Sequence, residues 1–131
     1  MLVEGLSSLL SGDSGLQGAV AGQIYPVLLP QNACLPAVTY QVVSTQSLYT
    51  LEERVNVNQC RMQFDIWSTD YLPGKQAAAA LTAAIDNFTG TLSEGTHVFG
   101  VQLQTSSDLY ESDARMNRVL IEFVIQYADP S

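Results

Sequence analysis

Apolar residues recur at helical spacing in two separate parts of the chain. The spacing predicts a short amphipathic helix over residues 2–11 and a main helix over Ala77–Phe88. Asp70 is a suitable N-cap for the main helix, Pro73 would lie in its first turn, and Gly90 is placed to end it. One stripe of the main helix is apolar, as in a helix that lies on a sheet, and it comprises Ala77, Leu81, Ala84, Ile85 and Phe88.

Alternation of apolar and polar residues predicts four strands, over Ala37–Ser44, Val55–Ser68, Thr96–Thr105 and Arg115–Tyr127. The polar stretch Thr45–Glu53 is too long for a tight turn and predicts a long hairpin arm or a loop. Ser106–Ala114 predicts a polar, acidic loop. The glycines within Leu16–Ile24 argue against a regular element there.

The last predicted strand departs from simple alternation. Its odd positions are apolar, as at Val119, Ile121 and Phe123, but Leu120 and Val124 at even positions are apolar too. A strand with one solvated face would alternate cleanly. This strand is therefore either central in the sheet or covered on its second face by something else.

Together these elements predict an α+β fold formed by a single domain over residues 1–131. A four-stranded, mainly antiparallel sheet of two hairpins carries the short N-terminal helix and the main helix on one face. The other face has no cover within the chain. We expect another subunit to supply it.

The charge of the chain limits its partners. The 131 residues carry 13 acidic and 5 basic side chains, a formal charge of -8. Proteins that grip nucleic acid neutralise phosphates with Lys and Arg, and this chain has too few to do so on a large scale. Two interpretations remain: a charge that maintains solubility, or a surface that lets a polyanion pass without binding. No apolar run approaches the length of a membrane-spanning helix, and the N-terminus does not have the pattern of a secretory signal.

Residues with the chemistry for catalysis or metal binding are few. Cys34, Cys60 and His97 do not have the spacing of a zinc site, and no nucleophile motif accompanies the single histidine. We therefore predict no enzyme activity, no metal and no cofactor. Tyrosines in or near predicted loops are candidates for contact surfaces or for ordinary loop anchoring, and they are Tyr49, Tyr71 and Tyr110.

Three stretches, taken in order, resemble a known family. They are Ile24–Pro26 through Pro30–Gln31 to Leu35–Tyr40; Cys60–Trp67 with Tyr71 and the alanine-rich helix; and Asp108–Glu111 with the strand that follows. The chain resembles the tail completion, or tail terminator, proteins of long-tailed bacteriophages and gene transfer agents. The resemblance spans nearly the whole chain.

The resemblance implies a structural virion subunit without catalysis. Such subunits form a ring, typically six-fold, that caps the tail tube, stops its growth, docks the head connector and lets DNA pass without specific binding. The implied partners are further copies of the chain, the tail tube protein and a head-completion protein, and the implied location is the tail or neck of the virion after assembly in the host cytoplasm. The alternatives are a head-closure ring of the neck and a small α+β ligand-binding domain or enzyme.

Two sets of residues follow from this implied role. We expect acidic residues to line the channel, chosen from Glu52, Glu53, Asp108, Glu111 and Asp113. We expect apolar and aromatic residues to contact other subunits or partners, namely Tyr49, Trp67, Tyr110, Leu120 and Val124.

Overall fold

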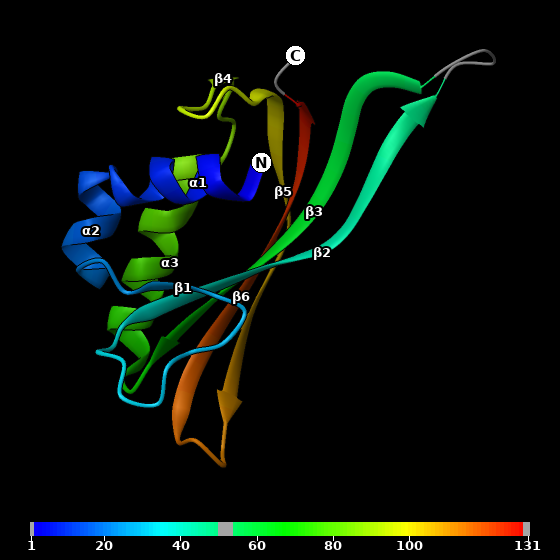
Figure 1. Cartoon of the computed structure of the whole chain (residues 1–131). Coiled ribbons are helices and arrows are strands. Elements are labelled where there is room, and N and C mark those ends of the chain that lie inside the picture. Colours follow the sequence, from blue (N-terminus) through cyan, green and yellow to red (C-terminus); the bar gives the residue numbers. More distant parts are fainter. Residues whose placement is uncertain (1, 50–53, 130–131) are drawn as a thin grey trace.

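The computed structural model describes residues 2–49 and 54–129 (Figure 1). Its first helix, α1 (Leu2–Ser11), buries Leu6 and Leu10, which lie one turn apart on the face predicted to be apolar. A second helix, α2 (Ser14–Val20), begins where the Asp13 carboxylate accepts a hydrogen bond from the Leu16 backbone N–H at 2.8 Å. The expectation of no regular element in this region is wrong, because a local N-cap starts the helix in spite of its glycines.

The main helix α3 (Tyr71–Ile85) lies against the sheet through small side chains and buries Ala77, Ala78 and Leu81. It begins at Tyr71 directly after Asp70, six residues before the predicted start at Ala77, with Pro73 in its first turn. The helix ends at Ile85 and not at Phe88. The prediction that Gly90 ends it is wrong, because the cap residue is Asp86 and Asn87 already has a φ of 62°.

The sheet has six strands in the described part of the chain, arranged in the order β1-β2-β3-β6-β5-β4. Their bounds are β1 Ile24–Pro26, β2 Ala37–Tyr49, β3 Arg54–Ser68, β4 Gly90–Thr91, β5 His97–Glu111 and β6 Met116–Ala128. All neighbours are antiparallel except β1 and β2. The α+β class is confirmed, and the four predicted strands form its centre. The two additional strands are edge strands of two and three residues, too short to leave a pattern in the sequence.

Strand β6 is central in the sheet, between β3 and β5. Its residues Val119, Ile121, Phe123 and Ile125 belong to the buried core. Phe123 meets Phe64 of β3 edge to face, with ring centroids 5.9 Å apart. The predicted central position is therefore confirmed, and cover of the second face by another subunit stays a prediction.

The two long hairpins extend beyond the helical layer at opposite ends of the molecule (Figure 1). The predicted arm is confirmed over the part that the structure describes, since β2 continues to Tyr49 and β3 begins at Arg54. The expectation of a loop over Ser106–Ala114 is wrong for most of its length, because β5 continues to Glu111 in register with β6. Cross-strand pairing therefore overrides the polar composition of this segment.

The helices lie on one face of the sheet, and no helix of the described residues covers the other (Figure 1). We call this second surface the open face. Register places Trp67, Asp65 and Gln63 of β3 on the open face, beside Arg118 and Leu120 of β6. The open face is thus a mixture of charged, polar and apolar side chains.

Candidate functional site

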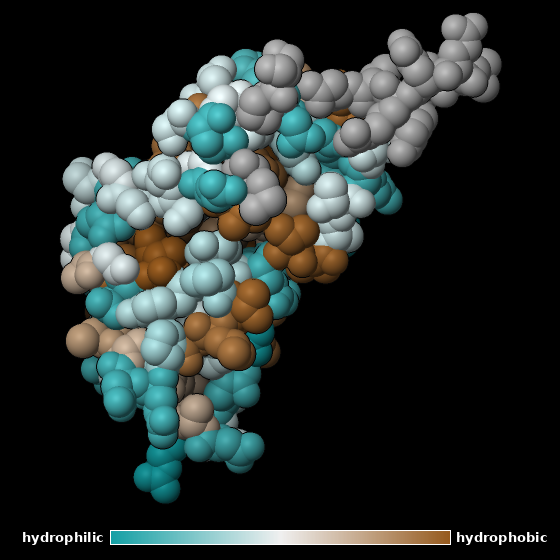
Figure 2. All heavy atoms as spheres, in the orientation of Figure 1, coloured by the Kyte–Doolittle hydropathy of each residue, from teal (hydrophilic) through white to brown (hydrophobic). Residues whose placement is uncertain are grey.

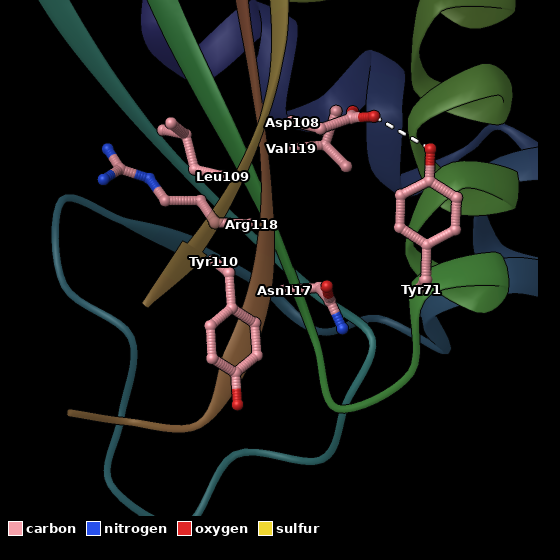
Figure 3. Close-up of a pocket in the computed structure, with 7 residues that line it drawn as sticks. All are labelled: Tyr71, Asp108, Leu109, Tyr110, Asn117, Arg118 and Val119. Carbon is pink, nitrogen blue, oxygen red and sulfur yellow. Dashed lines mark hydrogen bonds between the residues drawn. The ribbon is translucent and has the colours of Figure 1, made fainter. Parts of the chain in front are cut away.

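A hollow of about 190 Å³ lies between the first turn of α3 and the free end of the β5–β6 hairpin. Tyr71 contributes the helix side, and the strand side comprises Asp108, Leu109, Tyr110, Asn117, Arg118 and Val119. Figure 3 shows Tyr71 pointing from α3 toward Asp108, whereas Leu109 and Arg118 lie on the other side of the strands. The hollow is smaller than the roughly 300–1,000 Å³ of typical small-molecule sites.

Asp108 joins the helix to the hairpin through two contacts. Its carboxylate accepts hydrogen bonds from the Tyr71 hydroxyl at 2.9 Å and from Lys75 Nζ at 3.0 Å. The hydrogen bond from Lys75, and then that from Tyr71, lower the pKa of Asp108 below its ordinary value. The same contact with Asp108 raises the pKa of Tyr71 and of Lys75. The contacts are on the surface, so they orient the hairpin more than they stabilise it.

A second cluster of charges lies on the open face. Arg118 donates from Nε to Asp65 at 2.9 Å and from Nη1 to Glu111 at 3.0 Å, and its guanidinium lies 5.1 Å from the ring centre of Trp67. Burial lowers the pKa of Arg118, but its hydrogen bonds to the two carboxylates outweigh burial and raise it. The indole of Trp67 donates to the Thr39 hydroxyl at 3.0 Å. The cluster is a packed network that ties β3, β5 and β6 together.

The residues with metal-binding or nucleophilic chemistry lie apart. Cys34 is exposed, Cys60 is buried, and both are free thiols. Burial raises the pKa of Cys60, so this thiol is a poor nucleophile. His97 Nδ1 lies 3.1 Å from the Thr91 hydroxyl. Among the described residues, no three His, Cys, Asp or Glu side chains gather closely enough to hold a metal ion.

The predicted channel residues fall in different places. Glu52 and Glu53 lie outside the described residues. Asp108 and Glu111 are near the end of β5, but they face opposite sides of the sheet, and each pairs with a basic side chain. Asp113 is exposed in the turn between β5 and β6. The structure thus brings three of the five to one hairpin, two of them in ion pairs.

The predicted contact residues also differ in exposure. Tyr110 is 60 % exposed, whereas Trp67 and Leu120 are half-buried and Val124 is buried. Tyr49 ends β2, but its side chain lies outside the described part. Sequence reasoning missed Arg118 as the centre of the open-face network. The available signal was an arginine inside a strand that carries apolar residues on both faces, since such a charge needs a partner.

Within the described ranges, none of the helices has the length and apolar character needed to cross a bilayer.

Comparison with known proteins places the chain in a family. A family model described as "Tail completion protein gp17" matches residues 4–128. Among solved structures, a chain from "Virion of native gene transfer agent (GTA) particle" has the same fold, with a TM-score of 0.77 and 17% identity over 93% of this chain and 90% of that one. No curated protein sequence matches. The chain therefore belongs to the tail completion protein gp17 family and is a virion-associated structural protein of a phage-type tail.

Proposed function

We propose that copies of this chain form a six-fold ring on the end of the tail tube. The ring ends the growth of the tube and presents a face to the head connector, and DNA passes through its hole. The observation that carries this proposal is a sheet that extends past its helical cover at both ends, in a chain of the tail completion family (Figure 1). Projecting hairpins leave large surfaces for neighbours. The hollow beside Tyr71 is small, and a larger one of about 420 Å³ between α3 and Ser106 is wide open to solvent.

A closed ring requires two different contact surfaces on each subunit, because each copy meets its neighbours head to tail. The contact residues that we propose are Tyr49, Trp67, Tyr110, Leu120 and Val124. Tyr110 supports this role most directly, since its ring is 60 % exposed near the end of β5. A large, rigid and amphipathic ring of this kind is enriched in protein interfaces.

We also propose that the bore of the ring repels DNA. The candidate lining residues are Glu52, Glu53, Asp108, Glu111 and Asp113. Lys75 and Arg118 already balance two of these carboxylates, so the other three would supply most of the repulsion. An acidic lining offers phosphates no counterion release and would therefore let the duplex slide.

The proposal is tested by mixing purified protein with assembled tail tubes and, separately, with DNA-filled capsids, followed by electron microscopy. We expect rings at one end of the tubes and none on capsids alone. Binding to the capsid portal without binding to tubes would instead identify a head-closure ring. Absence of binding to both would refute the proposed function.

A variant sharpens this test. Tyr110→Ala should lower the fraction of capped tubes, because it removes an exposed ring from the proposed contact surface. Leu72→Ala is the matched control, since Leu72 is 63 % exposed on α3 and lies outside the predicted contact set. Equal capping by both variants would remove Tyr110 from the interface.

A further inference from the structure

The sheet has two long strand edges without a partner in the described residues. Strand β2 pairs with β1 only at residues 38–40, and its outer edge is free from Gln41 onward. Strand β5 pairs with β4 at His97 and Val98, and the Asn87 backbone N–H donates to the Val101 carbonyl at 3.2 Å. The outer edge of β5 is therefore free from Gln102 to Glu111. We call these the β2 edge and the β5 edge.

Neither edge contains a proline, and the charged side chains of the β5 edge lie only toward its end, at Asp108 and Glu111. Soluble proteins protect exposed edges with charges, particularly Lys, with Pro, or with bulges. The stretch from Gln41 to Tyr49 contains no charged residue and no proline, in a chain of net charge -8. The β5 edge is uncharged from Gln102 to Ser107, and the carboxylates beyond it pair with basic side chains. The β2 edge has register shifts between Val42 and Ser44 and between Ser47 and Tyr49, and the β5 edge has one between Leu103 and Thr105. Regular backbone therefore runs over Ser44–Ser47 on the β2 edge and over Thr105–Glu111 on the β5 edge.

Exposed apolar side chains also concentrate on these two strands. Figure 2 shows apolar surface over the middle of β2 and over the β1–β2 connection. Six of the ten large hydrophobic residues that are exposed among the described residues lie on β2 or β5, and they are Val42, Val43, Phe99, Leu103, Leu109 and Tyr110. Apolar surface beside an unpaired edge favours burial against a further strand.

We propose that the β5 edge of one copy pairs with the β2 edge of the next, so that the ring contains one continuous sheet. This inference rests on the proposed ring. Strand direction alternates along β2, β3, β6 and β5, so a neighbour related by rotation about the ring axis places its β2 antiparallel to β5. The antiparallel pattern of the sheet thus continues across the contact. The two edges are on opposite sides of the sheet, as a head-to-tail contact requires.

The register of this contact follows from closure. In a closed barrel the strands are tilted by about 40° from the axis, and neighbouring strands are about 4.8 Å apart. Across the four strands of one copy, this tilt displaces the next copy along the strand direction by about 16 Å, or about five residues. Within one chain, Ser44 pairs with Arg61, Arg61 with Val124, and Val124 with Gln102. Ser44 and Gln102 therefore lie at the same height on the two edges of the sheet. The shift cannot run toward His97, because β4 occupies that end. It therefore places Ser44 near Ser107 of the next copy.

This register pairs both free edges along most of their length. With Ser44 opposite Ser107, the stretch from Gln41 to Ser47 of the β2 edge meets β5 between Gln104 and Tyr110, all of it free in the described residues. Register within one chain places both Ser44 and Ser107 on the open face. Because side chains keep their face when a sheet continues, these two side chains would lie on the same side of the contact. Ser106 belongs to the helix face.

Engineered cysteines test this contact in rings assembled on tail tubes. In a Cys34→Ser background, Ser44→Cys combined with Ser107→Cys should form disulfides between copies on oxidation with copper phenanthroline, giving a ladder of covalent multimers. A second pair combines Ser44→Cys with Thr105→Cys, which lies two residues away on the same face and so tests the neighbouring register. Ser106→Cys is the matched control, because it is one residue away but on the opposite face, and its pair with Ser44→Cys should remain uncrosslinked.

Each outcome is decisive. A ladder with the open-face pairs, and monomers with each single cysteine, supports the shared sheet. Tubes that are capped by rings with no crosslink from either open-face pair overturn the edge pairing and leave the proposed function standing. Dimers from a single cysteine would show a two-fold contact and refute the head-to-tail pairing. Failure of the unsubstituted chain to cap tubes at all would refute the proposed function itself.

Discussion

The open-face network around Arg118 provides a quantitative test of the fold. Arg118→Met keeps an unbranched apolar stem but removes the guanidinium that contacts Asp65, Glu111 and Trp67. The side chain of Asp65 is only 9 % exposed. The substitution therefore leaves the nearly buried carboxylate of Asp65 without its cation. Gln63 Nε2 still donates a hydrogen bond to this carboxylate at 3.0 Å.

The expected loss follows from these contacts. Removing one partner of a fully buried ion pair costs about 3–5 kcal/mol. Because Gln63 still donates to Asp65, and the Arg118 side chain is 22 % exposed, we expect a loss of about 2–3 kcal/mol of unfolding free energy. An unfolding entropy of about 2.1 cal/mol/K per residue converts this loss to a decrease in Tm of about 9 °C for this chain.

Calorimetry of Arg118→Met, of Asp65→Asn and of the double variant measures this loss and its coupling. The double variant should be less destabilised than the sum of the single variants, because the two residues share one interaction. Arg61→Met is the control, since Arg61 meets Glu122 at 3.2 Å and its own side chain is 48 % exposed, so its loss should cost less than about 1 kcal/mol. Equal Tm values for Arg118→Met and Arg61→Met, or strict additivity in the cycle, would refute the reasoning.

The remaining predictions concern packing and surface charge. Gly5→Ala should destabilise the fold by about 1–3 kcal/mol in urea unfolding, because its new methyl would lie 2.8 Å from Leu92 Cβ. Gly18→Ala should instead stabilise it by about 0.5–1 kcal/mol, since nothing lies within 4 Å of that methyl; loss of stability in this control would show that the helix does not form as described. Asp108 has a lowered pKa in the folded chain. Its contacts therefore stabilise the fold at any pH above the ordinary pKa of a carboxyl group, and this stabilisation is lost as the pH falls through the lowered pKa. Lys75→Met should raise the pKa of Asp108 in an NMR titration, and an unchanged pKa would contradict the contact.

Much of the fold follows from local pattern. The apolar face of residues 2–11, the long alternation before Ser68 and the apolar character of β6 were sufficient to predict the first helix, two hairpins and one covered face. The position of β6 in the sheet remained open, because the pattern of apolar and polar residues indicates which side chains are buried but not which strands lie beside it. Only strand pairing shows that β3 and β5 flank this strand.

The errors arose where contacts distant in sequence decide the structure. The segment from Ser106 to Glu111 is polar, and it forms a strand because β6 pairs with it along its length. The candidate site was harder still. The partners of Arg118 come from β3 and from the end of β5, 53 and 7 residues away, and no spacing rule links them.

The length of tail tubes tests the central claim most directly. Purified tube protein is polymerised with and without this chain at a fixed ratio, and the length distribution is measured by electron microscopy. A ring that caps tube ends predicts shorter tubes, each with a density at one end, and a length that falls as more of the chain is added. Tubes of unchanged length with bare ends would contradict the account.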